Sequence, residues 1–108
     1  MKNNLLEFLE HGLRYVYPSE PGGVTRGMPT AHSAPPINSY ISASESFVWP
    51  WAEGEARGQS IEPLHPSVPQ ACAKDPFLYE LISSVDVIRL GRAREKQRAI
   101  EELRQRIL

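Results

Sequence analysis

Prolines and glycines crowd the middle of this 108-residue chain and limit the regular structure that it can form there. Residues 18–69 contain nine of the ten prolines and five of the seven glycines. Proline fixes its own backbone φ angle and has no amide donor, so long helices and interior strands are disfavoured in such a segment. The segment also holds Phe47, Trp49 and Trp51, large apolar residues of a kind that disordered linkers lack. We therefore predict ordered, proline-rich loops with short strands.

The most defensible regular element of this middle segment is a β-hairpin. Its arms would be SFVWPW (46–51) and ARGQSIEPL (56–64), and AEGE (52–55) would form the turn. Pro50 would then lie at a sheet edge or a bulge, because it cannot donate a ladder hydrogen bond.

The first 17 residues predict a short helix followed by a strand. Apolar residues recur at helical spacing, namely Leu5, Leu6, Leu9 and Leu13. Asn4 and Glu7 resemble a capping pair, and Gly12 is a plausible terminator. LRYVYP (13–18) then has β-branched and aromatic residues before a proline, which favours a strand that ends at Tyr17.

The sequence pattern of residues 67–108 predicts the C-terminal helices. Ser67 before Pro69, and Asp75 before Pro76, each place a capping side chain ahead of a proline in a first helical turn. Two apolar stripes follow at helical spacing, the first made of Leu78, Leu81, Ile82, Val85 and Ile88 and the second of Ile100, Leu103 and Ile107.

Three cations interrupt these stripes. In one unbroken helix, Arg89, Arg92 and Lys96 would share a face with both stripes, and burying an unpaired charge costs roughly several kcal/mol. Three alternatives stay open. The helix breaks at Gly91 and the last segment folds back, the cations extend their charged ends into solvent, or the cations meet carboxylates or a bound anion.

The charge and cysteine content exclude several classes of protein. The formal net charge is -1, although residues 89–108 hold seven of the twelve Lys and Arg. A lone Cys72 excludes a disulfide framework and a multi-cysteine metal site, and the three histidines are widely scattered, so we expect no metal and no cofactor. The apolar runs are far shorter than the ~20 residues that span a bilayer, and no signal peptide is recognisable. We expect a cytoplasmic protein with no membrane segment.

Two groups of residues are candidates for a binding site. TRGMPTAHSAPP (25–36) is expected to form an ordered covering loop in which Arg26 bonds free backbone carbonyls; alternatively, Thr25, Arg26 and His32 hold a small anionic ligand. The basic tail suggests either nucleic acid held by Arg89, Arg92 and Lys96 or a homodimer formed through an exposed stripe of Ile100, Leu103 and Ile107. No residue is predicted to be catalytic.

Four stretches of the chain resemble a known family. HGLRYVYP, TRGMPTAHSAPP, EPLHPSVPQA and DPFLYELISSVDVIRLGRAREK resemble, in this order, the C-terminal portion of bacterial winged-helix or MarR-like transcriptional regulators, over about residues 5–108. The resemblance implies a DNA-reading helix-turn-helix upstream of an accessory segment. Because few residues precede Leu5, we expect the DNA-reading part to be missing or reduced here and to be supplied by another protein.

These observations predict one small α+β domain, residues 1–108. It would contain an N-terminal helix and strand (1–17), proline-rich loops with a small antiparallel sheet or hairpin (18–66), and C-terminal helices (67–108). The expected function is a non-enzymatic binding or dimerisation module of a bacterial transcription-regulatory system. The alternatives are a nucleic-acid-binding accessory protein and a small ligand-sensing or enzymatic domain with its site in the 25–36 loop.

Overall fold

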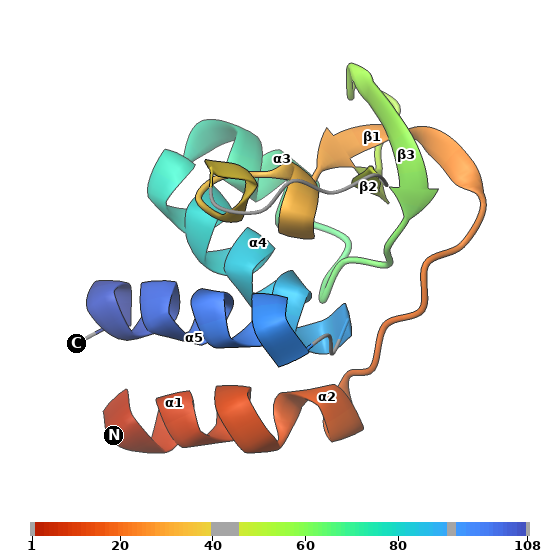
Figure 1. Ribbon diagram of the computed structural model, residues 1–108. Helices are drawn as coiled ribbons and strands as arrows, with labels where there is room; N and C mark the ends of the chain where they lie inside the picture. The colour runs from red at the N-terminus through yellow and green to blue at the C-terminus, as the bar shows by residue number, and fades with distance from the viewer. Residues whose placement is uncertain (1, 40–45, 91–92, 108) are drawn as a thin grey trace.

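The computed structural model describes residues 2–39, 46–90 and 93–107 and confirms the predicted α+β class. Its α-helices are α1 (Lys2–His11), α2 (Leu13–Val16), α3 (Val68–Lys74), α4 (Pro76–Leu90) and α5 (Ala93–Ile107). Its strands are β1 (Val24–Pro29), β2 (Phe47–Pro50) and β3 (Ala56–Ser60), and two 3-10 turns are η1 (Ala31–Ser33) and η2 (Ile37–Ser39). Figure 1 shows the strands at one end of the molecule and α1 beside α5 at the other.

The sheet is small and closed, and its topology differs from the predicted hairpin. Strand β1 pairs antiparallel with both β2 and β3, whereas β2 and β3 pair parallel to each other. The hairpin prediction is therefore wrong, and the covering-loop prediction is wrong for residues 25–29, which belong to β1. Glycine makes this tight pairing possible, because a Cβ atom on Gly27 would lie 1.9 Å from the carbonyl oxygen of Trp49.

The N-terminal segment is helical throughout, so the predicted strand at 13–18 is wrong. The amides of Tyr15 and Val16 both donate to the carbonyl of Gly12, and the amide of Tyr17 donates to the carbonyl of Leu13. This extra helical turn buries the Leu13 side chain in the core, and that packing outweighs the local β propensity. Asn4 lies inside α1 and is not its cap, because the helix begins at Lys2.

The C-terminal helices form where the capping signals place them. Asp75 Oδ1 accepts a hydrogen bond of 3.1 Å from the amide of Leu78 in the first turn of α4. Helix α4 ends at Leu90, and α5 folds back to pack along it (Figure 1). Of the three alternatives for the basic tail, folding back is therefore confirmed. Gly91 and Arg92, where the break was expected, lie outside the described residues.

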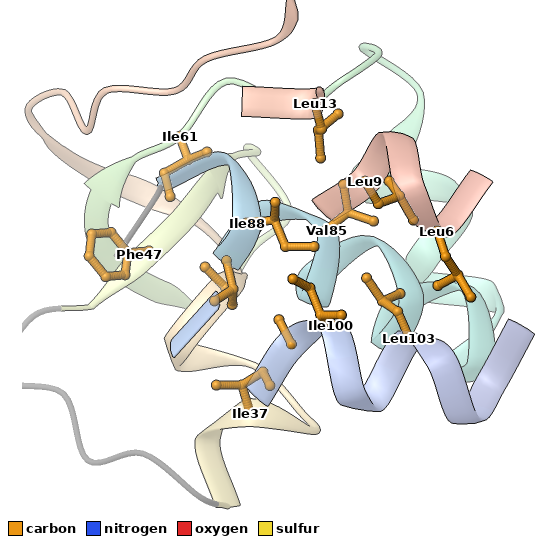
Figure 2. Close-up of a cluster of buried hydrophobic side chains, with 13 residues drawn as sticks. Leu6, Leu9, Leu13, Ile37, Phe47, Ile61, Val85, Ile88, Ile100 and Leu103 are labelled. Carbon is orange, nitrogen blue, oxygen red and sulfur yellow. The ribbon is translucent and has the colours of Figure 1, made fainter. Parts of the chain in front are cut away.

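The core lies mainly among α1, α4 and α5, and Phe47 of β2 extends it to the sheet. Figure 2 shows its main side chains, which are Leu6, Leu9, Leu13, Ile37, Phe47, Ile61, Val85, Ile88, Ile100 and Leu103. The stripe of α5 is part of this core, since Leu103 is only 1% exposed and Ile107 packs against the cluster. The prediction of an exposed dimerisation stripe on α5 is therefore wrong, because folding back gives these residues apolar contacts within their own chain.

No helix within the described ranges combines the length and the apolar character that a bilayer-spanning segment needs.

Candidate functional site

A buried polar cluster joins α4 to the sheet and to the N-terminal segment. The Asp86 side chain is fully buried and accepts three hydrogen bonds. Their donors are Thr30 Oγ1 at 2.7 Å, Trp49 Nε1 at 2.6 Å and the Arg89 guanidinium at 2.8 Å. These partners come from three separate parts of the chain, so Asp86 fixes the sheet and the segment after β1 against α4.

Arg89 is the second charged member of this cluster. Its side chain is 5% exposed, and its Nε donates a 3.0 Å hydrogen bond to the carbonyl of Tyr17, just beyond α2. The same guanidinium pairs with Asp86 one helical turn earlier. The predicted contact of Arg89 with nucleic acid is therefore wrong, because its charge is neutralised inside the molecule. The expectation that tail cations meet carboxylates is confirmed for this residue.

The protonation state of Asp86 follows from its neighbours. Burial raises the pKa of Asp86, while the charge of Arg89 and the donated hydrogen bonds from Thr30, Arg89 and Trp49 oppose that rise. All three neighbours act as donors, an arrangement that a carboxylate accepts in full and a protonated carboxyl does not. We therefore assign the charged form of Asp86, paired with Arg89.

A hollow of about 510 Å³ adjoins Arg89 at the surface. Its lining includes Tyr15 of α2, Ser19 and Glu20 in the segment after α2, Phe47 of β2 and Arg89 near the end of α4. An anion here would find the positive charge of Arg89 already matched by Asp86 and would meet the carboxylate of Glu20 at the rim. The hollow is therefore poorly suited to an anionic ligand.

The three residues predicted to hold a ligand lie in different surroundings. Thr25 is half-buried and Arg26 is exposed in β1, whereas His32 in η1 is 3% exposed, its ring 5.5 Å from that of Phe47. Among the described residues, the side chain of Arg26 donates no hydrogen bond to a backbone carbonyl, so its predicted role as a brace is wrong. His32 is thus part of the interior.

The half-buried Tyr79 and the buried Cys72 are two further groups with reactive side chains. The hydroxyl of Tyr79 donates to the carbonyl of Pro29 at 2.5 Å, and burial raises the pKa of Tyr79 to about 12. Burial, with the charges of Asp86 and Asp75, raises the pKa of Cys72 to about 11, so the thiol stays protonated at neutral pH and is a poor nucleophile. Cys72 is thus a small buried residue of the interior.

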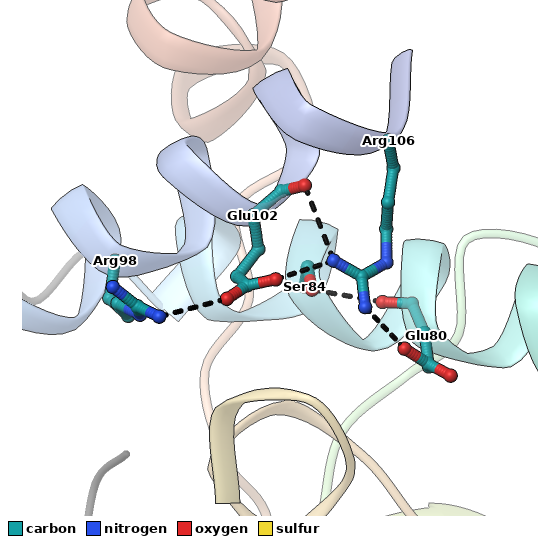
Figure 3. A network of polar contacts seen from close by, with 5 residues as sticks. All are labelled: Glu80, Ser84, Arg98, Glu102 and Arg106. Carbon is teal, nitrogen blue, oxygen red and sulfur yellow. Dashed lines mark hydrogen bonds and ion pairs between the residues drawn. The ribbon is translucent and has the colours of Figure 1, made fainter. Parts of the chain in front are cut away.

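Two further cations of the tail, Arg98 and Arg106, have acidic partners (Figure 3). Glu102, 4% exposed, accepts from Arg98 at 3.0 Å and from Arg106 at 2.5 Å, and Arg106 also pairs with Glu80 of α4. This network ties α5 to α4 and uses charge that a nucleic-acid surface would need. Lys96 is half-buried. Arg92, the third cation predicted to bind nucleic acid, lies outside the described residues.

An apolar surface that the sequence reasoning missed lies along α1 and α2. Among residues 2–39, 46–90 and 93–107, five of the seven exposed large apolar residues belong to this segment, namely Leu5, Phe8, Tyr15, Val16 and Tyr17. Leu5, Phe8 and Tyr17 border a hollow of about 330 Å³ whose other walls include Leu64 and Val85. We call this the N-terminal apolar face. The sequence contains a signal for this face. Leu5 and Phe8 widen the apolar arc of Leu6 and Leu9 beyond what one buried stripe needs, so part of the arc must remain exposed.

Comparison of the chain with family models, with curated proteins and with solved structures gives no match. Within the described ranges, no three His, Cys, Asp or Glu side chains gather in a way that could hold a metal ion. The function must therefore be inferred from the surfaces and buried groups of the chain itself.

Proposed function

We propose that this domain is a non-enzymatic binding module of a bacterial transcription-regulatory system. The N-terminal apolar face would hold a protein partner that carries a DNA-reading domain. The observation that carries the proposal is the exposure of Leu5 (47%) and Phe8 (39%) beside an apolar hollow. Adjacent exposed apolar groups of this size mark interaction surfaces, because water is excluded from them when a partner binds.

The position of this face supports a DNA-reading partner. In the regulators that the chain resembles, the helix-turn-helix comes before the accessory segment. A DNA-reading unit arranged in that way would meet α1, the first helix of the accessory segment, before any other element. Aromatic side chains such as Phe8 and Tyr17 are frequent anchors in protein interfaces.

The buried cluster supports a binding role over a catalytic one. Asp86 is fully buried, and its acceptor positions are occupied by Thr30, Trp49 and Arg89. A general base must reach the proton that it removes, and a carboxylate enclosed in this way does not contact a substrate. The cluster therefore serves to hold the sheet against α4 and, through the bond from Arg89 to the Tyr17 carbonyl, to fix the end of α2, which carries part of the N-terminal apolar face.

Site-specific photo-crosslinking in the native host tests the proposal. A photoreactive phenylalanine analogue at position 8 should capture a protein with a helix-turn-helix domain, whereas the same analogue at Gln105, an exposed position on α5, should not. The captured protein is then purified and titrated calorimetrically with the domain. Leu5→Ser combined with Phe8→Ser should weaken binding at least about tenfold, because anchor residues each contribute more than ~1 kcal/mol.

Asn4→Ser is the matched control, since Asn4 is an exposed polar residue of the same helix, and it should leave the affinity unchanged. The proposal is wrong if position 8 captures only a second copy of this chain or no protein. It is also wrong if the Leu5 and Phe8 variant binds the captured protein as tightly as the natural sequence does.

A further inference from the structure

The sheet end of the molecule carries two cations and two anions without partners. Arg26 of β1 and Arg57 of β3 lie directly opposite each other in antiparallel register, and both are exposed. Glu53 and Glu55, also exposed, lie in the connection from β2 to β3. Across residues 2–39, 46–90 and 93–107, none of these four side chains forms an ion pair or a hydrogen bond.

This placement is unfavourable for a monomer. Cross-strand partners have Cβ atoms ~5 Å apart, and like charges directly opposite are destabilising. Nothing in the described part of the chain neutralises Arg26 and Arg57, whereas three cations of the tail have acidic partners. A group that brings negative charge to this arginine pair, and positive charge to the glutamates beside it, would stabilise the sheet end.

The backbone holds the two pairs of charges in a fixed relation. The amide of Trp51 donates to the carbonyl of Arg26 at 3.2 Å, and the amide of Gly54 donates to the carbonyl of Trp51 at 3.0 Å. Gly54 packs directly on Gly27, since a Cβ atom there would lie 2.3 Å from the Gly27 carbonyl. The β2–β3 connection, which carries both glutamates, therefore lies tightly against β1, which carries Arg26.

An apolar hollow lies beside these charges. It has a volume of about 400 Å³, and Met28, Trp51 and Ala56 line it together with Glu53 and Glu55. Trp51 is half-buried and presents part of its ring. An aromatic residue surrounded by charged groups is the usual anatomy of an interface centre with a polar rim.

We propose that the sheet end is a twofold contact with a second copy of this chain, in which the arginine pair of each copy faces the glutamate pair of the other. A twofold interface joins the same patch on both copies, so it must be complementary to itself. A patch with two positive and two negative charges side by side meets that requirement, and each charge gains an opposite partner. Overall charge does not oppose the contact, because the chain is nearly neutral.

The contact goes beyond the proposed function and uses a different surface. The strands and α1 lie at opposite ends of the molecule (Figure 1), so pairing through the sheet leaves both N-terminal apolar faces free. Such a pair would present two partner-binding faces, directed away from the shared contact.

A charge-exchange experiment tests the contact by sedimentation equilibrium of the full chain at low salt. The natural chain should form dimers that dissociate as salt is added. Arg26→Glu with Arg57→Glu gives a wholly acidic patch, and Glu53→Arg with Glu55→Arg gives a wholly basic one. Each variant alone should dimerise roughly 100-fold more weakly, because like charges then face each other. An equimolar mixture of the two variants should restore a dimer.

The controls separate this contact from general charge effects and from unfolding. Lys74→Glu with Arg104→Glu changes the net charge as much as the acidic variant does, at exposed positions on α3 and α5, and should leave the dimer intact. Arg26→Gln with Arg57→Gln, a milder pair for use if a reversal unfolds the sheet, should weaken the dimer. The basic variant should restore pairing only in part, because the remaining glutamate pair then faces an arginine pair while the glutamines face uncompensated cations.

Three results would overturn the proposal: a natural chain that stays monomeric at low salt, a mixture that fails to pair, and a control variant that dissociates equally. Phe8→Ser should not change the mass in this assay. If it abolishes the dimer, the second copy occupies the N-terminal apolar face and the sheet contact is wrong. Because the crosslinking experiment concerns a different surface, the two proposals can fail separately.

Discussion

Replacing Asp86 by asparagine should remove a large part of the free energy of unfolding. The change keeps the shape of the side chain but deletes its charge and turns one acceptor oxygen into an amide donor. Arg89 then keeps a positive charge in a site where its side chain is 5% exposed. The new amide group would also face at least one of the donors that now point at Asp86, from Thr30, Trp49 and Arg89.

The expected magnitude follows from the burial of this pair. Removing one partner of a buried ion pair costs about 3–5 kcal/mol, whereas an exposed pair contributes about 0–1 kcal/mol. Asp86 is fully buried, so the larger range applies. Domains of this size unfold with about 5–15 kcal/mol, so a loss of about 3–5 kcal/mol should remove roughly a fifth or more of the free energy of unfolding.

Urea unfolding followed by circular dichroism measures this loss. With an m-value of about 2 kcal/mol per molar urea, the midpoint should fall by about 2 M. Glu101→Gln, at an exposed position of α5, should leave the midpoint unchanged. In a double-mutant cycle, adding Arg89→Gln to Asp86→Asn should cost less than the sum of the single changes, because no unpaired charge then remains. A loss below about 1 kcal/mol, or an additive cycle, would refute the assignment of a buried ion pair.

Two further predictions concern the sheet. The pKa of Tyr79 is raised to about 12 from 10.0, so its contribution to stability should be complete below pH 10 and decrease as the pH rises toward 12. Tyr79→Phe should cost about 1 kcal/mol at neutral pH, because it deletes the hydrogen bond to Pro29, and should reduce the loss of stability between pH 10 and 12 in urea titrations. An unchanged pH profile would contradict the role of Tyr79. Gly54→Ala should lower the thermal midpoint by the equivalent of about 1–3 kcal/mol, because its Cβ would overlap the backbone of Gly27. Gly23→Ala, where no atom lies within 4 Å, should change stability by less than about 1 kcal/mol, and equal effects of the two changes would show that β1 and the β2–β3 connection are not in contact.

Local signals were sufficient to predict the C-terminal half of the fold. Asp75 before Pro76 predicts the start of α4, and the structure has the expected bond from Asp75 to the amide of Leu78. The cations among the apolar stripes left three alternatives open, and folding back of the last segment, one of these, is what α4 and α5 show. Caps and stripes can be identified from sequence because both depend on residues within a few positions of one another.

The sheet could not be predicted in the same way. Its segments are short, and the pairing of β2 and β3 depends on β1, which inserts antiparallel to both. Residues 13–16 are also helical although their side chains favour a strand, because the helical turn buries Leu13 in the core. Strand pairing and burial of this kind depend on contacts between segments far apart in the chain.

The amino-acid sequence by itself determined the α+β class, the helix starts of the C-terminal region and the presence of cations among its apolar stripes. Only the tertiary structure decided which cations are neutralised and what surface remains. Arg89 is one half of a buried pair, while Arg26 and Arg57 face each other on the surface. The physical reason is that the environment of a charge is set by the groups that the fold brings within a few ångströms of it, and these come from distant parts of the chain.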